Sequence, residues 1–286
     1  MKKYIKLLRV HHYVKNFLIF LPLLFSKRMF EPELLLKTIL AFLTFSLTGS
    51  LVYIINDIKD VEKDKMHSTK CKRPIASGEV KIPSAVIMLV ILLCAVVIIN
   101  IFALKTSYES TMCLFAYVIM NVFYSMGLKQ IPIIDVAILA LGFFLRLLYG
   151  AHVTGIEISN WFYLTTILGS LYLGLGKRRN EIKTEGTDKR EVLKLYTYEF
   201  LDKNMYMCIS LAIVFYSLWT IDALNKDRGV LMWTIPLLVL ICMKYSLNIE
   251  KGGDGDPTEV ILKDKALLGM ILLYGVFMFV VLYGIV

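Results

Sequence analysis

Long apolar runs are the sequence feature that most constrains what this chain can fold into. A membrane-spanning helix needs about 20 predominantly apolar residues, and nine segments reach or approach that length. These segments are Val10–Phe25, Leu34–Ile55, Ile82–Leu104, Ser110–Leu128, Ile131–Gly150, Trp161–Gly176, Met205–Leu224, Val230–Leu247 and Ala266–Val286. The first is the weakest, because two histidines, Lys15 and Pro22 interrupt it. The sequence therefore predicts an all-α integral membrane protein with nine transmembrane helices, forming one domain over residues 1–286.

The composition agrees with a chain that lies largely in lipid. Apolar residues make up 57% of the sequence and charged residues 19%, against about 45–50% and about 25% in soluble domains. These values exclude a soluble enzyme, a disordered chain and a small secreted scaffold. The formal net charge of +9 is explained by cytosolic loops that face anionic lipid, so we expect no nucleic-acid partner.

The distribution of lysine and arginine predicts the orientation in the membrane. Nine spans place the two termini on opposite sides. With the N-terminus in the cytosol, 25 of the 32 lysines and arginines fall in cytosolic segments and six in outer segments. Because positive residues accumulate on the cytosolic side, we expect a cytosolic N-terminus.

The densest group of ionisable residues follows the second apolar run. If the helix continues beyond that run, Asn56, Asp60 and Asp64 recur four residues apart on one face. Asp57 lies beside them. Carboxylates at this spacing repel one another, and a magnesium ion that also holds a phosphate relieves the repulsion. Lysines interleave with the carboxylates, so the spacing alone leaves open a solvated loop of mixed charge.

The residues that follow favour the metal site. Lys72 and Arg73 come within ten residues of the last carboxylate, and Pro74 then stops any helix. Carboxylates for a metal beside fixed cations for phosphate oxygens form the arrangement that a magnesium-diphosphate ligand needs. The segment therefore predicts a site for such a ligand.

Two further polar patches fall on the predicted cytosolic side. The segment Tyr124–Lys129 leads into an apolar run that carries Asp135 and, deeper, Arg146. An arginine inside a span indicates function by default, and a structural partner for a carboxylate or for helix-end carbonyls is the alternative. The segment Lys177–Glu181 either binds phosphate or anchors the sixth span among lipid headgroups. Together the patches indicate a phosphorylated ligand that approaches a lipid-accessible cavity from the cytosol.

The acidic segment also carries a resemblance. The pattern Asn56-Asp57-x-x-Asp60-x-x-x-Asp64, followed by Lys72-Arg73-Pro74-Ile75-Ala76-Ser77-Gly78, resembles the first aspartate-rich motif of the UbiA superfamily of intramembrane prenyltransferases. This resemblance implies a bundle of nine transmembrane helices. It also implies an active-site cavity that faces the cytosol and is open to lipid.

Other motifs are similar to one branch of that superfamily, the polyprenyl-phosphate (decaprenyl-phosphate) phosphoribosyltransferases. These motifs are Tyr13-Val14-Lys15-Asn16, Tyr124-x-x-x-Leu128-Lys129, Gly176-Lys177-Arg178-Arg179-x-Glu181, and Gly255-Asp256-Pro257-x-Glu259 with Asp264. Ordinary members of the superfamily carry a second motif with two carboxylates four residues apart. Here Asp135 is flanked at those positions by Ile131 and Leu139, which favours a different diphosphate donor.

The branch implies transfer of a 5-phosphoribosyl group from phosphoribosyl diphosphate (PRPP) to a polyprenyl phosphate, with Mg²⁺ as cofactor. By resemblance, Asp57, Asp60 and Asp64 are catalytic and hold the magnesium. The implied substrate-binding residues are Lys15, Asn56, Lys72, Arg73, Tyr124, Lys129, Asp135, Arg146, Lys177, Arg178, Arg179 and Glu181. The resemblance also implies a multi-pass protein of the plasma membrane with a cytosolic active site, acting in cell-wall precursor synthesis. An oligomer of identical chains is left open.

Two rival functions remain. A UbiA-type prenyltransferase would move a prenyl group from a prenyl diphosphate to an aromatic or other small acceptor. It would use the same acidic motif but should carry the second pair of carboxylates. A transporter would show inverted repeats and spans broken by glycine or proline, and the sequence shows neither.

Overall fold

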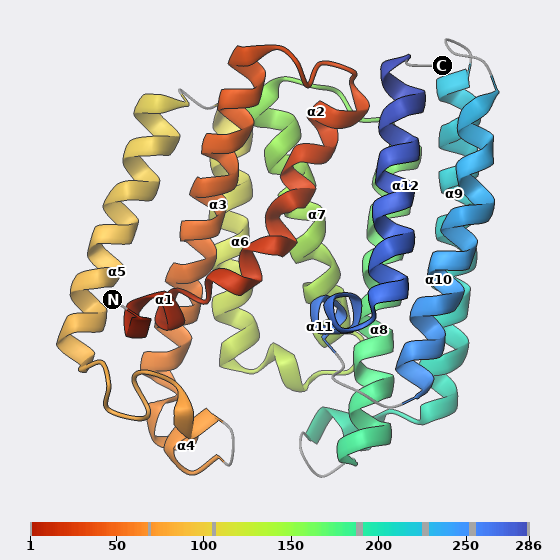
Figure 1. Ribbon diagram of the computed structural model, residues 1–286. Coiled ribbons are helices and arrows are strands. Elements are labelled where there is room, and N and C mark those ends of the chain that lie inside the picture. Colours follow the sequence, from red (N-terminus) through yellow and green to blue (C-terminus); the bar gives the residue numbers. More distant parts are fainter. Residues whose placement is uncertain are drawn as a thin grey trace. The chain divides into compact units, whose positions relative to one another are not determined.

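The computed structural model describes residues 2–67, 70–104, 107–186, 191–224, 229–251 and 256–284 (Figure 1). All regular structure among these residues is helical, and none of them lies in a strand. Contacts between residues divide the chain into two compact units. Unit 1 comprises residues 1–126 and 145–156, and unit 2 comprises residues 127–144 and 157–286. The all-α class is confirmed, whereas the single domain stays a prediction.

Unit 1 is built around the long helix α3. Its elements are α1 (Lys2–Leu8), η1 (Val10–Phe20), α2 (Leu21–Phe25), α3 (Pro32–Lys59), α4 (Val61–Lys65), η2 (Lys70–Lys72), α5 (Ile82–Val97), the π-helical η3 (Ile98–Ala103), α6 (Tyr108–Met126) and the second half of α7 (Ile134–Thr154). Helices α3 and α5 each carry a proline in the first turn, where its fixed φ suits a helix start and its missing N–H costs nothing.

Unit 2 contains the first half of α7 and the remaining helices. Its other elements are η4 (Leu128–Gln130), α8 (Asn160–Glu185), η5 (Glu191–Leu195), α9 (Tyr198–Leu224), η6 (Val230–Trp233), α10 (Thr234–Glu250), α11 (Pro257–Lys263) and α12 (Lys265–Tyr283). Two side chains fix helix starts by accepting hydrogen bonds from backbone N–H groups. Ser159 caps α8, and Asp264 caps α12.

Six helices in the described part of the chain are long and apolar enough to cross a membrane. They are Pro32–Lys59, Ile82–Ala103, Ile134–Thr154, Tyr198–Asp222, Val230–Glu250 and Lys265–Tyr283. The other three predicted runs also fall on helical segments: η1 with α2, α6 and α8. A multi-pass membrane protein is therefore confirmed, while the count of nine spans stays a prediction. Gly255 and the last two residues of the final predicted run lie outside the described residues.

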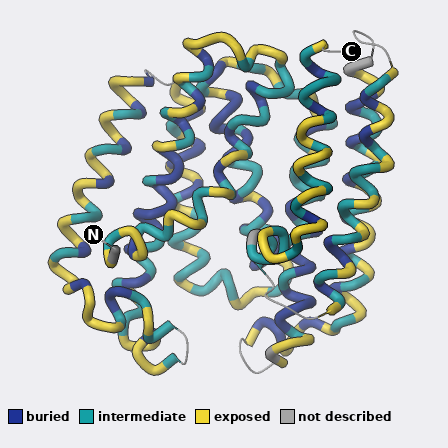
Figure 2. Tube along the Cα trace, viewed as in Figure 1, coloured by how far each residue is buried: buried dark blue, intermediate teal, exposed yellow. Residues whose placement is uncertain are grey.

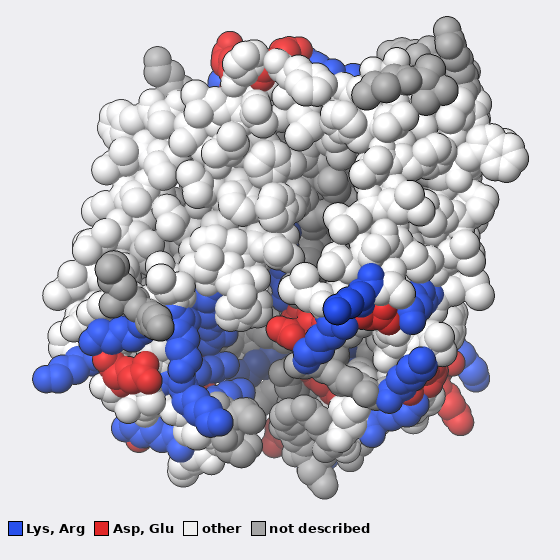
Figure 3. All heavy atoms as spheres, in the orientation of Figure 1, with Lys and Arg blue, Asp and Glu red and all other residues white. Residues whose placement is uncertain are grey.

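The outward surfaces of the helices suit a lipid environment. On α5, Ile87 is 61% exposed and Val90 is 51% exposed, and Figure 2 shows exposed positions along much of this helix. In Figure 3, uncharged atoms cover the middle of the helices, and charged side chains gather towards their ends. Contiguous exposed apolar surface of this kind is expected where lipid tails, rather than water, surround the protein.

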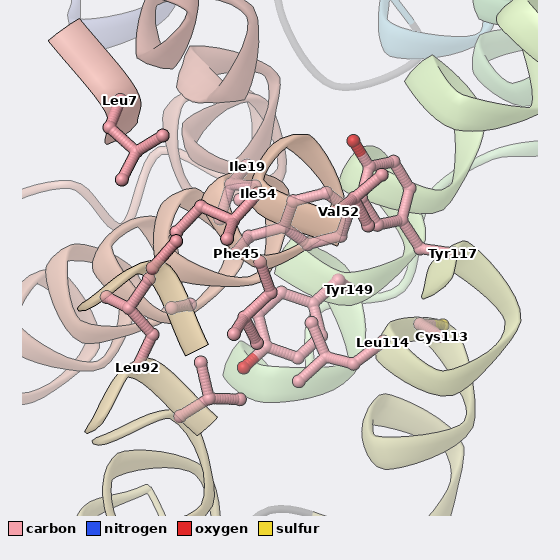
Figure 4. Close-up of a cluster of buried hydrophobic side chains, with 14 of the residues drawn as sticks. Leu7, Ile19, Phe45, Val52, Ile54, Leu92, Cys113, Leu114, Tyr117 and Tyr149 are labelled. Atoms are coloured by element: carbon pink, nitrogen blue, oxygen red, sulfur yellow. The ribbon is translucent and has the colours of Figure 1, made fainter. Parts of the chain in front are cut away.

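The core of unit 1 packs around three aromatic rings (Figure 4). Phe45 of α3 lies with its ring centroid 4.7 Å from that of Tyr117 and 5.6 Å from that of Tyr149. Close to these rings, α7 passes η1 at Gly150. A Cβ atom at Gly150 would lie 2.4 Å from the backbone oxygen of Ile19. Glycine is therefore required for this helix to approach η1 so closely.

Substitution of Gly150 by alanine tests this packing. We expect Gly150→Ala to destabilise the protein by about 1–3 kcal/mol, because the added methyl group meets backbone that cannot move aside. Thermal unfolding in detergent measures the effect. Gly269→Ala in α12 is the matched control, since its Cβ would meet nothing within 4 Å. Equal melting temperatures for both variants would contradict the close approach.

Candidate active site

The acidic segment forms a compact group of charges at the end of α3, which we call the acidic cluster (Asp57, Asp64, Arg9 and Arg73). Helix α3 continues past the apolar run but ends at Lys59, so Asn56, Asp60 and Asp64 do not share one face of a single helix. Asp60 lies between α3 and α4 with φ −96° and ψ 11°, so the chain turns there. The carboxylates that converge are those of Asp57 and Asp64, seven residues apart, which corresponds to about two helical turns.

Two arginines neutralise these carboxylates. Arg73 Nη1 lies 2.6 Å from Asp64 Oδ2 and 3.2 Å from Asp57 Oδ1. Arg9 Nη2 donates to the same Asp57 Oδ1 at 2.5 Å, and its guanidinium lies 4.7 Å from the ring centroid of Tyr53. Asp57 is 2% exposed and Asp64 3%. Carboxylates buried to this extent need paired cations, and Arg73 is the cation that both share.

One oxygen of the acidic cluster lacks a partner. Asp57 Oδ2 is buried and makes no hydrogen bond with any residue that the structure describes. Asp60, which the sequence analysis grouped with the other two carboxylates, is half-buried between the helices. Among the described residues, no group of three or more His, Cys, Asp or Glu side chains is arranged to hold a metal ion. The cluster thus offers two converging carboxylates, and the three-carboxylate magnesium site stays a prediction.

Four other residues of unit 1 were predicted to bind substrate, and they differ in how far they are buried and in their contacts. Asn56 accepts a hydrogen bond from Ser125 Oγ at 2.7 Å, which joins α3 to α6. Lys15 and Tyr124 are half-buried, and Lys72 is exposed. Their predicted contact with substrate stays a prediction.

Arg146 lies in the interior of unit 1. Its side chain is 8% exposed. Its Nε donates to Asn16 Oδ1 at 2.6 Å, and its Nη2 donates to Tyr117 OH at 3.2 Å. The guanidinium also lies 5.0 Å from the ring centroids of Phe45 and Tyr117. An amide, a phenol and aromatic faces therefore hold this cation inside the membrane-spanning part of the unit.

In unit 2, Asp135 lies at the centre of a second group of buried charges. Asp135 is fully buried. Its Oδ2 accepts from Arg178 Nε at 2.5 Å, and its Oδ1 accepts from the Tyr196 hydroxyl at 2.7 Å. Arg178 Nη1 also donates to Glu181 Oε2 at 2.8 Å. Both carboxylate oxygens of Asp135 are thus engaged within the unit. Lys129, in η4 of the same unit, is half-buried.

Tyr196 also holds a strained turn at the start of α7. Ile133 has φ +69°, a conformation that costs a β-branched residue about 1–3 kcal/mol. The backbone N–H of Ile133 donates to the Tyr196 hydroxyl at 2.5 Å. Burial raises the pKa of that hydroxyl, so it keeps the proton that it donates to Asp135. Tyr196 therefore fixes both the turn and the carboxylate.

The three consecutive cations after the sixth apolar run all face carboxylates. Arg179 pairs with Asp202 at 2.8 Å and with Glu250, and Lys177 lies 3.6 Å from Asp256. Arg178 and Arg179 are 1% and 2% exposed. Guanidinium groups buried to this extent cannot lie among lipid headgroups, which argues against the anchor interpretation. Their binding of donor phosphates stays a prediction.

Sequence reasoning missed Arg9 in the acidic cluster and Tyr196 beside Asp135, and it also missed Asp202 and Glu250, the partners of Arg179. Arg9 is 48 residues from Asp57 and Tyr196 is 61 residues from Asp135. No local spacing connects partners so distant in the chain. A positive φ of 52° at Arg9, uncommon for a residue other than glycine, is visible only in the structure.

Comparisons with known proteins show the family and agree with the fold. The sequence model of the UbiA prenyltransferase family matches residues 17–259. The decaprenyl-phosphate phosphoribosyltransferase of Corynebacterium glutamicum is 33% identical over 273 residues, which cover 92% of this chain and 81% of that protein. The protein of the same name from Mycolicibacterium smegmatis is 31% identical, covering 92% and 87%.

A solved structure confirms the fold at lower identity. A UbiA homolog from Archaeoglobus fulgidus, bound to DMAPP and Mg²⁺, superimposes with a TM-score of 0.71. The match covers 99% of this chain and 100% of that one, at 17% sequence identity. At this identity the likeness establishes the arrangement of helices alone.

Removal of the Tyr196 hydroxyl tests the contacts of Asp135. Tyr196→Phe removes one of the two side-chain hydrogen bonds that Asp135 accepts from described residues, leaving that from Arg178. It also leaves the Ile133 N–H without the Tyr196 acceptor. A lost hydrogen bond that leaves buried groups unsatisfied costs about 1–3 kcal/mol, so we expect a lower melting temperature in detergent. Tyr206→Phe is the control, because Tyr206 lies on α9 with 43% of its surface exposed. An unchanged melting temperature in Tyr196→Phe would show that the hydroxyl holds neither group.

Proposed function

Because the chain belongs to the UbiA prenyltransferase family, we propose that it is the member that moves a 5-phosphoribosyl group from PRPP to a polyprenyl phosphate and releases diphosphate. The observation that carries this proposal is the similarity to proteins named decaprenyl-phosphate phosphoribosyltransferase. It extends over 92% of this chain at 31–33% identity. The acidic cluster supplies the chemistry that a diphosphate donor requires.

The residues of the acidic cluster fit a magnesium ion that is shared with a substrate. Magnesium is usually held by one or two carboxylates and completed by phosphate oxygens and water. Asp57 and Asp64 converge on one cation, Arg73, and Asp57 Oδ2 has a free coordination position. We assign the metal to Asp57 and Asp64, with Asp60 at the turn beside them. Bound there, it would neutralise the charge that develops on the leaving diphosphate.

The arginines of the acidic cluster have a second task in this proposal. Their N–H groups already lie at the carboxylates, so they are in place to donate to the phosphate oxygens of a donor. A guanidinium suits this task because its planar fork matches phosphate oxygens in pairs. Arg73 has 28% of its side chain exposed and Arg9 has 18%, which leaves both reachable by a ligand.

The reaction itself needs positioning more than proton transfer. An oxygen of the lipid phosphate attacks the anomeric carbon of the donor, and the bond from that carbon to the diphosphate breaks. A phosphate monoester is largely ionised near neutral pH, so no strong general base is required. The 5-phosphate stays on the ribose, and the product is a polyprenyl-phosphoribose. Catalysis rests on alignment and on electrostatic stabilisation of the leaving group.

A prenyltransferase reaction is the second candidate, since a UbiA homolog was solved with DMAPP. That reaction should use a second pair of carboxylates. Both oxygens of Asp135 already accept hydrogen bonds, from Arg178 and Tyr196. This favours the phosphoribosyl donor, because each oxygen of the carboxylate already has a partner.

Substitution of Asp64 tests the acidic cluster, and substitution of the nearby Glu62 is the control. We expect Asp64→Asn to reduce turnover at least about 100-fold, because the site loses a charge that metal and Arg73 both need; this corresponds to about 2.7 kcal/mol. Turnover is measured as radiolabel transferred from PRPP to polyprenyl phosphate with saturating magnesium. Glu62→Gln should keep the parent rate, since Glu62 is 76% exposed and its ion pair is with Lys65, which is itself exposed.

Near-parent turnover in Asp64→Asn would remove this residue from the site. Loss of turnover in both variants would point to a general effect of charge on α4. Label transferred from a prenyl diphosphate in place of PRPP would favour the second candidate function.

The orientation proposed for the protein is that of a plasma-membrane enzyme with its N-terminus and active site in the cytosol. The lysine and arginine distribution supports it. Helix α3 offers a direct test, because Glu33 near its start is 80% exposed and Lys63 beyond its end is exposed. In a variant without the five native cysteines, we expect Lys63→Cys to react with an impermeant thiol reagent only from the cytosolic side. Glu33→Cys should react only from outside, and the reverse pattern would overturn the cytosolic site.

A further inference from the structure

A cavity of about 450 Å³ lies where α10, α11 and α12 meet in unit 2. Among the described residues, its charged lining consists of three lysines, Lys251, Lys263 and Lys265, and one aspartate, Asp264. The lysines come from three different elements: the residue after α10, the end of α11 and the start of α12. Cations from separate elements thus surround one space. The proposed transfer reaction uses none of these four residues.

The one carboxylate in the lining is already engaged. Asp264 accepts from the backbone N–H groups of Ala266 and Leu267 at 2.8 and 2.9 Å, which caps α12. Lys244 Nζ lies 2.9 Å from the other carboxylate oxygen. The Lys244 hydrogen bond and the backbone N–H of Leu267 hold the pKa of Asp264 well below its usual range. Asp264 is therefore ionised, and Lys244 balances its charge.

The positive charges of the lining lysines are largely not neutralised by carboxylates that the structure describes, so they are available to bind an anion. Lys263 has an exposed partner in Glu259, at 3.4 Å one helical turn away. Lys251 and Lys265 form no ion pair with any residue that the structure describes. An anion in the cavity would meet at least these two ammonium groups, and a phosphate is the anion that lysine most often binds as a point charge.

The position of the cavity along the helices indicates what carries that phosphate. The span of α10 ends at Glu250, and the span of α12 begins at Lys265. The cavity therefore lies at the polar end of two spanning helices, at the level where lipid headgroups lie. Figure 3 shows blue side chains at this place, over α11 and the start of α12, directly beside the uncharged band. Basic pockets between transmembrane helices bind anionic headgroups.

We propose that this cavity binds the phosphate headgroup of an anionic membrane lipid, held by Lys251 and Lys265 while the lipid chains lie along α10 and α12. Its volume equals that of about fifteen water molecules, which is enough for a phosphate with a small substituent. Two lipids share this chemistry: an anionic phospholipid and a polyprenyl phosphate. Binding is independent of the transfer reaction, because no residue of the acidic cluster lines the cavity.

Lipid-dependent thermal stability tests the site without measuring activity. A lipid that binds the folded protein raises its melting temperature in proportion to ln(1 + [L]/Kd). The purified full chain in neutral detergent is titrated with phosphatidylglycerol, with a polyprenyl monophosphate and with zwitterionic phosphatidylcholine. We expect a rise in melting temperature with at least one anionic lipid, and no comparable rise with phosphatidylcholine. The anionic lipid that acts at the lower concentration identifies the source of the headgroup.

Variants of the lining lysines test whether the lipid-dependent rise in melting temperature arises from binding in the cavity. The double variant Lys251→Gln/Lys265→Gln should need at least about tenfold more anionic lipid for the same rise. Lys251→Arg/Lys265→Arg should behave like the parent, since the charges are kept. Lys203→Gln, an exposed lysine on α9 of the same unit, should also behave like the parent. An unchanged lipid response in the Gln double variant would overturn the proposal. An equally weakened response to anionic lipid in Lys203→Gln would also overturn the proposal, since it would show that lipid is attracted by the overall positive charge and not by the cavity.

Discussion

The buried carboxylates of Asp57 and Asp64, joined by Arg73, are the constraint on which the rest of unit 1 depends. Two ionised groups at 2% and 3% exposure are stable only with a cation between them, because removing one partner of a buried pair costs about 3–5 kcal/mol. Arg73 comes from the segment after α4, and Arg9 from the start of the chain. Their ion pairs therefore hold the N-terminus, α3 and the acidic segment in one arrangement.

Buried charges are also paired in unit 2, but there both oxygens of the central carboxylate, Asp135, have partners. Asp135 is engaged by Arg178 and Tyr196, and Arg179 is engaged by Asp202 and Glu250. Each buried cation has its carboxylates within the unit. The contacts of Asp135 hold the start of α7 against α8 and against Tyr196, the residue that follows η5. Asp57 Oδ2 remains without a partner among the described residues. That difference is why we place the metal in the acidic cluster.

The sequence predicted the helices well and the partners of charged residues poorly. Apolar runs predicted a helical segment at all nine places, because length and hydropathy are local properties. The sequence analysis considered a helix that continues past its apolar run, and α3 does extend to Lys59 and carries Asp57. It could not predict that Asp60 would lie at a turn, nor that Arg9 and Tyr196 would complete the two groups. Such partners are set by tertiary packing between segments about 50 residues apart or more.

Identification of the lipid product tests the central claim most directly. The purified chain is incubated with PRPP, magnesium and a polyprenyl phosphate, and the lipid extract is analysed by mass spectrometry alongside a measurement of released diphosphate. We expect a lipid whose mass has increased by one phosphoribosyl group, with one diphosphate released per lipid formed. Diphosphate release without that lipid, or a prenylated product formed only from a prenyl diphosphate, would contradict the proposed reaction.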